Sequence, residues 1–277
     1  MKHALKLPEI ENPRVWRLLL LLEEGGLRVV AVSTVDDSSV IVCGIPFDPS
    51  AGDMPAALEE AVYAAPFLLS DFEKVDVLVS TSEYIVAPAS LTTEALEAAA
   101  VYSAIVGEGE SAHTDAVDGT DAVVLWSLRD DVARFLARTF RNPALHCRIS
   151  PLVRYFSRKT QLGNTGKIYT HITAEPPVVD IVAFGHDGAL RLAVTKPVTA
   201  AADSAYWILA CAREAGLDPA SDEILLCGDN AARHELMPLL RRYAGYVMPV
   251  IFPSAAFRSG RDALNAPFPL ILIPLCE

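Results

Sequence analysis

The first half of the chain alternates short apolar runs with clusters of turn-forming residues. The runs at 14–23, 27–33 and 40–45 are rich in leucine, isoleucine and valine, and Glu24-Gly25-Gly26 separates the first two. Short apolar runs bounded by such residues are typical of β-strands, and glycine supplies the positive φ that a tight turn needs. This pattern predicts a meander of three strands at the start of the chain.

After the meander, apolar residues recur at helical spacing in several segments, and short buried strands lie between these segments. Asp53 is a suitable N-cap for the first helix, because its side chain can accept a hydrogen bond from a free N–H of the first turn. The predicted elements are a helix at 53–69, a strand at 75–80, a helix at 93–106, a strand at 122–127, a helix at 130–139, a strand at 144–150 and a helix that opens at Ser150-Pro151.

The second half repeats this order of elements without repeating the residues. Asp187-Gly188 is a strong signal for a two-residue hairpin turn inside a second meander. The chain therefore contains an internal duplication of architecture. The predicted elements are strands at 167–174, 178–184 and 189–195, a helix at 200–215, a strand at 223–227, a helix at 231–243, a strand at 246–252 and an apolar tail at 268–275.

Two segments have the composition of connections. Residues 107–121 carry five carboxylates and no lysine or arginine. They lack the alternation of acidic residues before a central glycine that an EF-hand requires, so we expect a solvated acidic loop rather than a calcium site. The breaker cluster at 161–166 marks the expected boundary between two lobes.

The composition predicts a globular protein, with 52% hydrophobic and 21% charged residues. The net charge of −12 argues against general binding to nucleic acids or anionic membranes.

The longest purely apolar run, Leu18 to Leu22, is far shorter than a membrane span, and no signal-peptide pattern follows Met1, so we expect a cytoplasmic protein without membrane insertion. Five scattered cysteines without metal-ligand spacing predict buried thiols and no zinc site.

The charge is distributed unevenly along the chain. Residues 1–125 carry 21 acidic and 6 basic side chains, whereas residues 126–277 carry 14 acidic and 17 basic ones. This asymmetry fits either two solvated surfaces of different composition or a polar molecule that docks its lobes, its copies or a partner head to tail.

The duplicated layout resembles the plan of the actin, Hsp70 and sugar-kinase group. Residues 178–184 followed by Asp187-Gly188 resemble the second phosphate-binding segment of these proteins, and residues 224–228 resemble the strand that ends in their paired-glycine adenosine motif. Residues 82–88 and the helix after them look like the extra subdomain of the pilus-assembly and cell-division branch. The whole chain also resembles an uncharacterised bacterial family with an actin-like ATPase fold.

This resemblance implies an α/β protein of two ribonuclease-H-like lobes, each with a meander–helix–strand–helix pattern. The N-terminal lobe is expected at 1–163, with a subdomain inserted at about 82–127, and the C-terminal lobe at 164–277. The resemblance also implies a cleft between the lobes.

The residues that would grip a nucleotide phosphate are largely missing from the resembled segment. Thr173 stands where the group has an aspartate that helps to hold the metal-bound phosphates, and Glu175 with Pro176-Pro177 stands where it has three glycines. Proline has no N–H to offer a phosphate, and Glu175 places a negative charge where a polyanion would lie. Only Asp180 is retained.

The other two nucleotide segments depart from the pattern as well. The first-lobe turn at 23–27 lacks the Asp-x-Gly-Thr sequence, and Gly228 is followed by Asp229 rather than by a second glycine. We therefore expect no ATP hydrolysis, no cofactor and no metal. The degenerate nucleotide-site positions are Thr173, Glu175, Asp180, Gly228 and Asp229.

Other candidate sites are weaker. Residues 163–168 have glycines and a lysine but not the spacing of a phosphate loop, so a lobe hinge is the better interpretation. A local basic stretch surrounds Tyr155 and Phe156 and consists of Arg148, Arg154, Arg158, Lys159 and Lys167. It fits either a patch for anions or single-stranded nucleic acid or, better, a helix with a solvated basic face and its aromatic rings in the core. His171 and His186 lie near the degenerate phosphate segment, where a pocket role competes with surface or hydrogen-bonded histidines.

Two functional hypotheses follow. The first is a non-catalytic actin-like scaffold or partner-binding protein, because the architecture is retained while the phosphate contacts are lost. The alternative is an unconventional nucleotide-binding ATPase or kinase that uses the interlobe cleft, with Asp180, Thr173, Glu175 and Asp229 as its expected ligands. A binding protein for another small anion is a third hypothesis.

Overall fold

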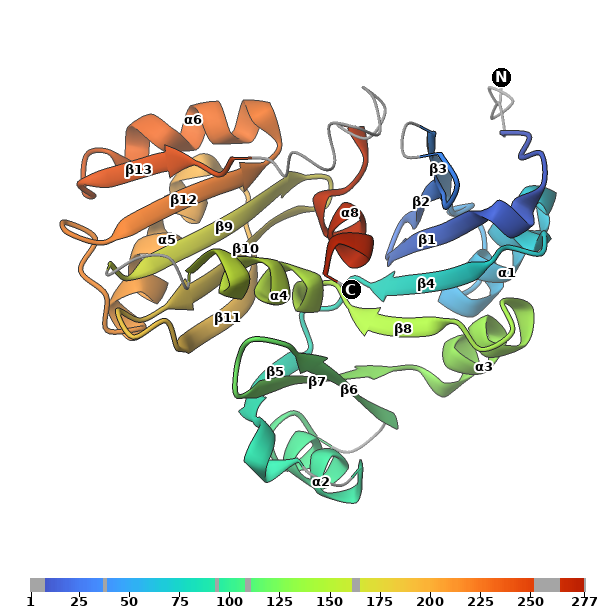
Figure 1. Cartoon of the computed structure of the whole chain (residues 1–277), viewed down its shortest axis with the longest axis horizontal. Coiled ribbons are helices and arrows are strands. Elements are labelled where there is room, and N and C mark those ends of the chain that lie inside the picture. The colour runs from blue at the N-terminus through green and yellow to red at the C-terminus, as the bar shows by residue number, and fades with distance from the viewer. Residues whose placement is uncertain are drawn as a thin grey trace.

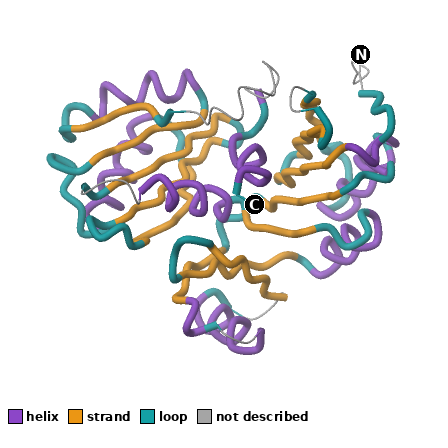
Figure 2. Tube along the Cα trace, viewed as in Figure 1, coloured by secondary structure: helices purple, strands orange, loops and turns teal. Residues whose placement is uncertain are grey.

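The protein consists of two five-stranded sheets side by side and a small three-stranded sheet that protrudes between them (Figure 1). The structure, a computed structural model, describes residues 8–36, 39–92, 95–107, 111–160, 165–251 and 265–276. Helices lie around the layers of strands (Figure 2). The mixed α/β architecture with two similar halves confirms the fold class that the sequence predicts.

The first sheet has the strand order β3-β2-β1-β4-β8. The meander pairs antiparallel, and β4 and β8 add to it in parallel, because helical crossovers separate them in the sequence. Leucines 18 to 22 of β1 are buried on both faces of the sheet. The strands are β1 (Trp16–Glu23), β2 (Gly26–Ser33), β3 (Val40–Pro46), β4 (Lys74–Val79) and β8 (Ala144–Cys147).

Two helices accompany this sheet. Asp53 caps α1 (Met54–Tyr63) by accepting a hydrogen bond from the N–H of Ala56. The helix predicted to reach residue 69 ends earlier, because proline disfavours helical backbone in the residue before it; a 3₁₀ turn, η2 (Pro66–Leu69), follows. The second helix is α3 (Asp130–Thr139). A further 3₁₀ turn, η1 (Pro13–Val15), precedes β1.

The protruding subdomain contains β5 (Tyr84–Pro88), β6 (Ser111–Val117) and β7 (Ala122–Leu128) in the order β5-β7-β6. The 3₁₀ turn η3 (Ala89–Leu91) and the helix α2 (Ala95–Ile105) complete it. The expectation of a solvated loop at 107–121 was wrong, because this segment contains β6, which pairs antiparallel with β7. Asp115 of β6 is buried, and its carboxylate accepts hydrogen bonds from the Cys147 N–H at 2.7 Å and the Ser150 hydroxyl at 2.5 Å, which offset the cost of burying it.

The second sheet has the order β11-β10-β9-β12-β13, which matches the order of the first. Strand Tyr246–Pro249 ends before Phe252, the predicted end; Phe252 lies outside the described residues. The strands are β9 (Lys167–Ala174), β10 (Pro177–Phe184), β11 (Leu190–Pro197), β12 (Glu223–Gly228) and β13 (Tyr246–Pro249), and the helices are α5 (Ala201–Glu214) and α6 (Asn230–Leu240). The boundary expected at 163/164 lies outside the described residues, as does most of the cluster at 161–166.

Two further helices join the lobes. The helix α4 (Ile149–Thr160) packs against the second sheet, where its Phe156 ring stacks on Tyr169 of β9 with centres 4.3 Å apart. The apolar tail forms α8 (Phe268–Leu275), whose Leu270 and Ile273 pack against β1 of the first sheet. The apolar core is therefore continuous between the two lobes, which favours one fixed arrangement. Within the described part of the chain, none of the helices has the length and apolar character to span a membrane.

Candidate functional site

A cleft of about 620 Å³ lies between the two lobes, and the start of α8 forms part of its wall. The ends of β1, β9 and β12, the first turn of α6 and the residues before α8 form its walls. The polar side chains that line it are Glu23, Arg28, Arg148, His171, Thr173, Glu175, Asp229, Asn230, Arg233 and Asn265.

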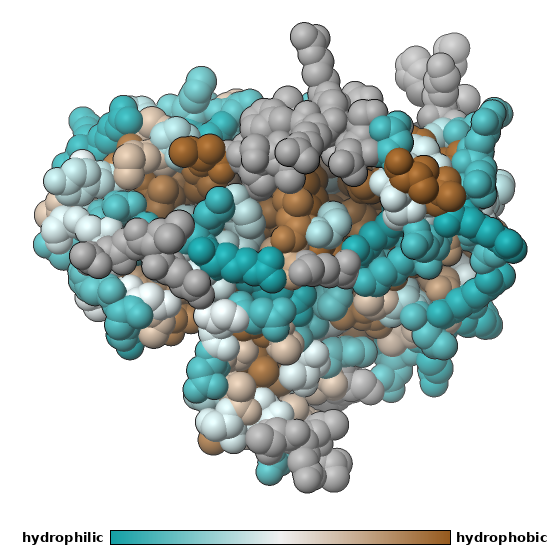
Figure 3. Space-filling model, viewed as in Figure 1, coloured by the Kyte–Doolittle hydropathy of each residue, from teal (hydrophilic) through white to brown (hydrophobic). Residues whose placement is uncertain are grey.

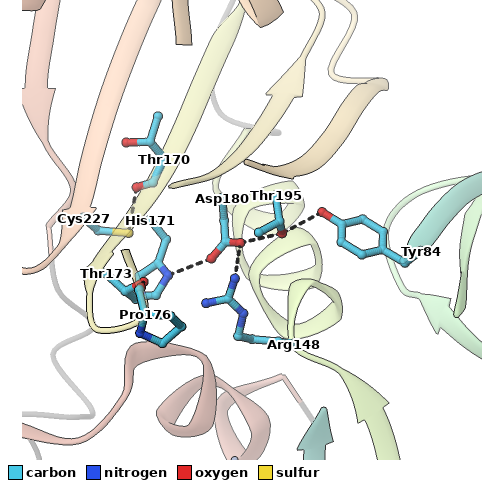
Figure 4. Close-up of polar contacts among 9 residues, drawn as sticks. All are labelled: Tyr84, Arg148, Thr170, His171, Thr173, Pro176, Asp180, Thr195 and Cys227. Carbon is cyan, nitrogen blue, oxygen red and sulfur yellow. Dashed lines mark hydrogen bonds and ion pairs between the residues drawn. The ribbon is translucent and has the colours of Figure 1, made fainter. Parts of the chain in front are cut away.

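Asp180 is buried beside this cleft and does not line it. Its carboxylate accepts hydrogen bonds from Arg148 Nη2 at 2.7 Å, from Thr195 Oγ1 at 2.7 Å and from His171 Nδ1 at 3.0 Å (Figure 4). The acceptor positions of a carboxylate are largely used by these three partners. Asp180, the one retained residue of the phosphate motif, therefore binds protein side chains.

The Asp180 partners come from separate parts of the chain. Arg148 lies between β8 of the first sheet and α4, whereas His171 and Thr195 belong to β9 and β11, the two strands that pair with β10. Burial alone would raise the pKa of Asp180, but the Arg148 charge and the hydrogen bonds from His171 and Thr195 outweigh burial and lower the pKa. The carboxylate is therefore ionised and tied to the first lobe by Arg148.

Tyr84 of β5 extends the network into the protruding subdomain. Its hydroxyl lies 3.0 Å from Thr195 Oγ1, and it must donate, because the Thr195 hydroxyl hydrogen is already given to Asp180 (Figure 4). Burial, followed by the nearby Asp180 charge, raises the pKa of Tyr84 well above its ordinary value. One connected set of hydrogen bonds thus links both lobes and the subdomain.

The turn between β9 and β10 faces the cleft without offering a phosphate cradle. Thr173 Oγ1 donates to the Pro176 carbonyl at 2.6 Å, so this hydroxyl closes the turn. Pro176 and Pro177 have no N–H, and the exposed Glu175 lies on the wall of the cleft. This turn therefore presents a carboxylate where a nucleotide-binding protein presents backbone N–H groups.

The opposite wall belongs to the β1–β2 hairpin. Burial raises the pKa of Glu23, while the attraction of Arg28, whose Nε lies 3.3 Å from the carboxylate, opposes this rise. A second hollow connects Glu23 and Glu24 with Glu175 and Pro176 of the other lobe. Carboxylates of both lobes thus line this hollow in excess over its one cation, Arg28, and this excess of negative charge would repel a polyphosphate chain.

Gly228 and Asp229 have structural roles at the adenosine strand. Gly228 has a φ of +98°, and a Cβ at this position would overlap the Ile172 carbonyl oxygen of β9. Asp229 caps α6 by accepting a hydrogen bond from the Ala232 N–H at 2.8 Å. The residue that replaces the second glycine therefore uses its side chain to begin a helix.

Arg233 is the basic side chain of α6 on the cleft wall. One of its terminal nitrogens contacts the Asn230 side-chain oxygen, whereas its Nε is buried and has no hydrogen-bond partner within the described part of the protein. Unpaired buried donors carry a free-energy cost, so this nitrogen is the clearest feature of the cleft that could favour an anion.

The other sequence candidates lie apart from the cleft or are already paired. The His186 ring lies 2.9 Å from Asp222. Arg154 donates to the Ala116 carbonyl, and Arg158 donates to the Cys276 carbonyl at the end of α8. The arginines of the basic stretch therefore stabilise neighbouring elements. Among the described residues, no group of three or more His, Cys, Asp or Glu side chains could hold a metal ion.

Sequence reasoning missed Arg148, Thr195 and Tyr84 as partners in this network. By sequence Arg148 belongs to the basic stretch around Tyr155, and its partner Asp180 lies 32 positions away, so no local spacing indicates the pair. The one available signal was the retained Asp180 inside an apolar strand, because a buried carboxylate requires partners.

Comparison with known proteins supports this description of the fold. A family model described as "Protein of unknown function (DUF3822)" matches residues 8–247, and the chain belongs to this family. None of the curated proteins matches the sequence. The predicted resemblance to an uncharacterised actin-like family is thereby confirmed.

Three solved structures match the chain at low sequence identity. A Bacteroides thetaiotaomicron protein with an actin-like ATPase fold and unknown function matches with a TM-score of 0.77 and 18% identity, over 96% of this chain and 99% of that chain. A chain of the PilM–PilN type IV pilus biogenesis complex matches with a TM-score of 0.50 and 15% identity, over 95% and 98% of the two chains. The ROK hexokinase from Thermus thermophilus matches with a TM-score of 0.38 and 10% identity, over 91% and 98%.

Proposed function

We propose that this member of the DUF3822 family is a non-catalytic, cytoplasmic actin-fold protein that acts by binding another protein. The single observation that carries the proposal is the environment of Asp180. This aspartate accepts hydrogen bonds from Arg148, His171 and Thr195 and is fully buried. A carboxylate in this state is not available to a magnesium ion or to its water shell.

The walls of the cleft support the same conclusion. Phosphoryl transfer depends on groups that neutralise the charge of the transferred phosphate, chiefly metal ions, backbone N–H groups and cationic side chains. Here the hollow between the hairpins is lined by three carboxylates, Glu23, Glu24 and Glu175, and by one cation, Arg28. The Pro176-Pro177 pair removes two backbone donors. The electrostatic arrangement therefore opposes a bound polyphosphate.

A partner-binding role is supported by what the protein retains. The two lobes keep the complete strand order of the fold, and a network of buried hydrogen bonds joins them in one arrangement. PilM, which has a similar fold, is present in a complex with PilN in type IV pilus biogenesis. A rigid two-lobed frame without a ligand-driven cycle is suited to presenting a surface to another protein.

Unconventional nucleotide binding is the second candidate. The observation that favours it is Arg233, whose Nε has no hydrogen-bond partner among the described residues and which lies in the wall of a cleft of about 620 Å³ beside the N-terminus of α6. A cation and a helix N-terminus can both attract an anion. This candidate requires the ligand to avoid Asp180 and to bind on the α6 side of the cleft.

Isothermal titration with Mg-ATP, Mg-ADP and Mg-GTP distinguishes the two candidates, together with an assay of phosphate release. We expect no saturable heat and no turnover above the buffer rate. A dissociation constant that Arg233→Ala weakens, while the exposed-site control Arg191→Ala leaves it unchanged, would contradict the first candidate and support the second. Turnover above background would contradict the non-catalytic role directly.

A further inference from the structure

Each large sheet ends in two edge strands, and three of these four edges carry a feature that opposes the addition of another strand. At β8 the outward N–H of Cys147 is already bound by the Asp115 carboxylate. At β13 the Val247 carbonyl accepts a hydrogen bond from Arg241, and Pro249 has no N–H. The edge strand β11 contains one arginine and one lysine. Proteins use such features to keep edge strands from pairing with other chains.

The fourth edge, β3, has none of these features. Its sequence contains no charged residue, and its one proline, Pro46, stands at the end of the strand. Residues 40–44 are only partly buried. Figure 1 shows β3 at the upper rim of the first sheet, and brown hydrophobic residues are exposed in this part of the molecule on the face that Figure 3 displays. Apolar, uncharged edges of this kind pair readily with another strand.

The outward backbone groups of β3 belong to alternate residues. The N–H of Phe47 donates to the Gly25 carbonyl at 2.9 Å, so the register with β2 directs the odd-numbered residues of β3 toward β2. Val40, Val42 and Gly44 therefore direct their N–H and C=O groups away from the sheet. Within the described part of the chain, none of these outward groups has a hydrogen-bond partner.

We propose that β3 is a dimerisation site, where it pairs antiparallel with β3 of a second copy about a two-fold axis at Val42. In this register Val42 of one copy lies opposite Val42 of the other, and Val40 lies opposite Gly44. The three outward N–H groups of each copy then donate to the three outward C=O groups of the other. The pairing ends at Pro46, which has no N–H to donate. This inference goes beyond the proposed function and does not depend on what the cleft binds.

A second copy fits this edge better than an unrelated strand. The outward groups are arranged symmetrically about Val42, so the strand is complementary to itself in the antiparallel direction. Like charges directly opposite each other destabilise a strand pair, and two copies of β3 place only uncharged side chains opposite one another. The strand also offers no charge by which a foreign strand could be selected. Two copies joined in this way form a closed dimer, the commonest kind of homo-oligomer.

Sedimentation of the full-length protein over a range of concentrations tests the dimer. We expect a reversible dimer of the 29.8 kDa chain. Sodium chloride should tighten it, because each copy has a net charge of −12 and salt screens the repulsion between the two. Val42→Pro removes an outward N–H without touching the hydrogen bonds to β2, and it should raise the dissociation constant of the dimer at least tenfold. Val42→Thr is the matched control, because it keeps both the N–H and the β-branched shape, and it should leave the dissociation constant unchanged.

Cysteine cross-linking tests the register. Cys43→Ala provides the background, because the other four cysteines are buried. Val42→Cys then places two thiols opposite each other in a hydrogen-bonded antiparallel pair, whose Cα atoms lie about 5.5 Å apart. This spacing suits a disulfide, so mild oxidation should give a covalent dimer. Val40→Cys is the control, because its two thiols would lie about 13 Å apart along the strands and should not link.

A second blocking variant guards against a folding defect in Val42→Pro. Gly44→Glu adds a charge to the edge, and its Cβ meets only ordinary contacts, the nearest being Arg28 Nη1 at 3.8 Å. It should weaken the dimer as Val42→Pro does, and melting curves establish that both variants fold. A monomer at every concentration would overturn the inference. So would a dimer that both substitutions leave intact, or oxidation that links Val40→Cys but not Val42→Cys.

Discussion

The guanidinium of Arg148 lies 2.7 Å from the carboxylate of Asp180, and this fully buried ion pair joins the two lobes. Arg148 follows the last strand of the first sheet, and Asp180 lies in β10 of the second. The one aspartate retained from the resembled phosphate segment is therefore part of the connection between the lobes.

Asp180→Asn should destabilise the protein strongly. The substitution leaves Arg148 buried without its counter-ion, and breaking a buried pair in this way costs about 3–5 kcal/mol. Urea denaturation measures the change in the free energy of unfolding. Asp187→Asn removes a carboxylate that pairs with Arg191 at the surface and should change the urea midpoint little. Equal losses in the free energy of unfolding for the two substitutions would show that the buried pair contributes no more to stability than the surface pair.

Tyr84→Phe should loosen the protruding subdomain without unfolding the lobes. It removes the hydrogen bond to Thr195, which contributes about 1 kcal/mol. Hydrogen exchange should become faster in β5 and β7 while β9 and β12 keep their rates. Tyr206→Phe, at an exposed ring of α5, serves as the control. Unchanged exchange in β5 would contradict the role of this contact.

Gly228→Ala should strongly destabilise the second lobe, because it forces β9 and β12 apart where they pair. The added Cβ would overlap the Ile172 carbonyl oxygen and lie 2.6 Å from the Ile172 nitrogen, both in the backbone of β9. Gly188→Ala is the matched control, because Gly188 also has a positive φ of +74° but no atom within 4 Å of the added Cβ. Its expected cost is only the backbone strain of about 1–2 kcal/mol. Thermal melting of both variants measures the difference in their stability. Similar melting points would show that the β9 backbone can shift to accommodate the added Cβ at little cost.

The histidine of β6 should make stability depend on pH near neutrality. Burial of the His113 ring lowers its pKa, although the Asp115 and Asp130 charges oppose this effect. The unfolded chain therefore takes up a proton at a higher pH than the folded protein, and stability falls as the pH decreases through about 6.5. His113→Gln should flatten this part of the curve, measured as urea midpoints between pH 8 and pH 5.5. An unchanged curve would show that other groups cause the dependence.

The strands and helices could be predicted from the sequence because their signals are local. The strand at 167–174 and the helix at 130–139 have the predicted bounds, since apolar runs and helical spacing arise from neighbouring residues. The sequence also contains the signal for the early end of α1, because Pro66 disfavours helical backbone in the residue before it; the predicted end at residue 69 did not use this signal. The strand at 111–117 was missed, since its polar composition resembles a loop and its pairing with β7 is a tertiary contact.

The arrangement of the candidate site could be predicted only in part. The loss of backbone donors at Pro176 and Pro177 follows from residue types alone. The partners of Asp180 do not, because the Arg148 pair depends on how β8 and β10 meet across the lobes. The role of Gly228 likewise depends on the close approach of β9 to β12, which no pattern within the strand indicates.

The central claim is that the cleft of this actin-like fold does not hold a nucleotide, and a thermal melt with millimolar Mg-ATP tests it most directly. A ligand that binds only the folded state at 100 times its dissociation constant adds about 2.7 kcal/mol of stability, which moves the melting midpoint by several degrees. We predict no shift with Mg-ATP, Mg-ADP or Mg-GTP. A clear rise with any of them would show that the cleft binds nucleotides despite the buried Arg148–Asp180 pair, and it would contradict the claim.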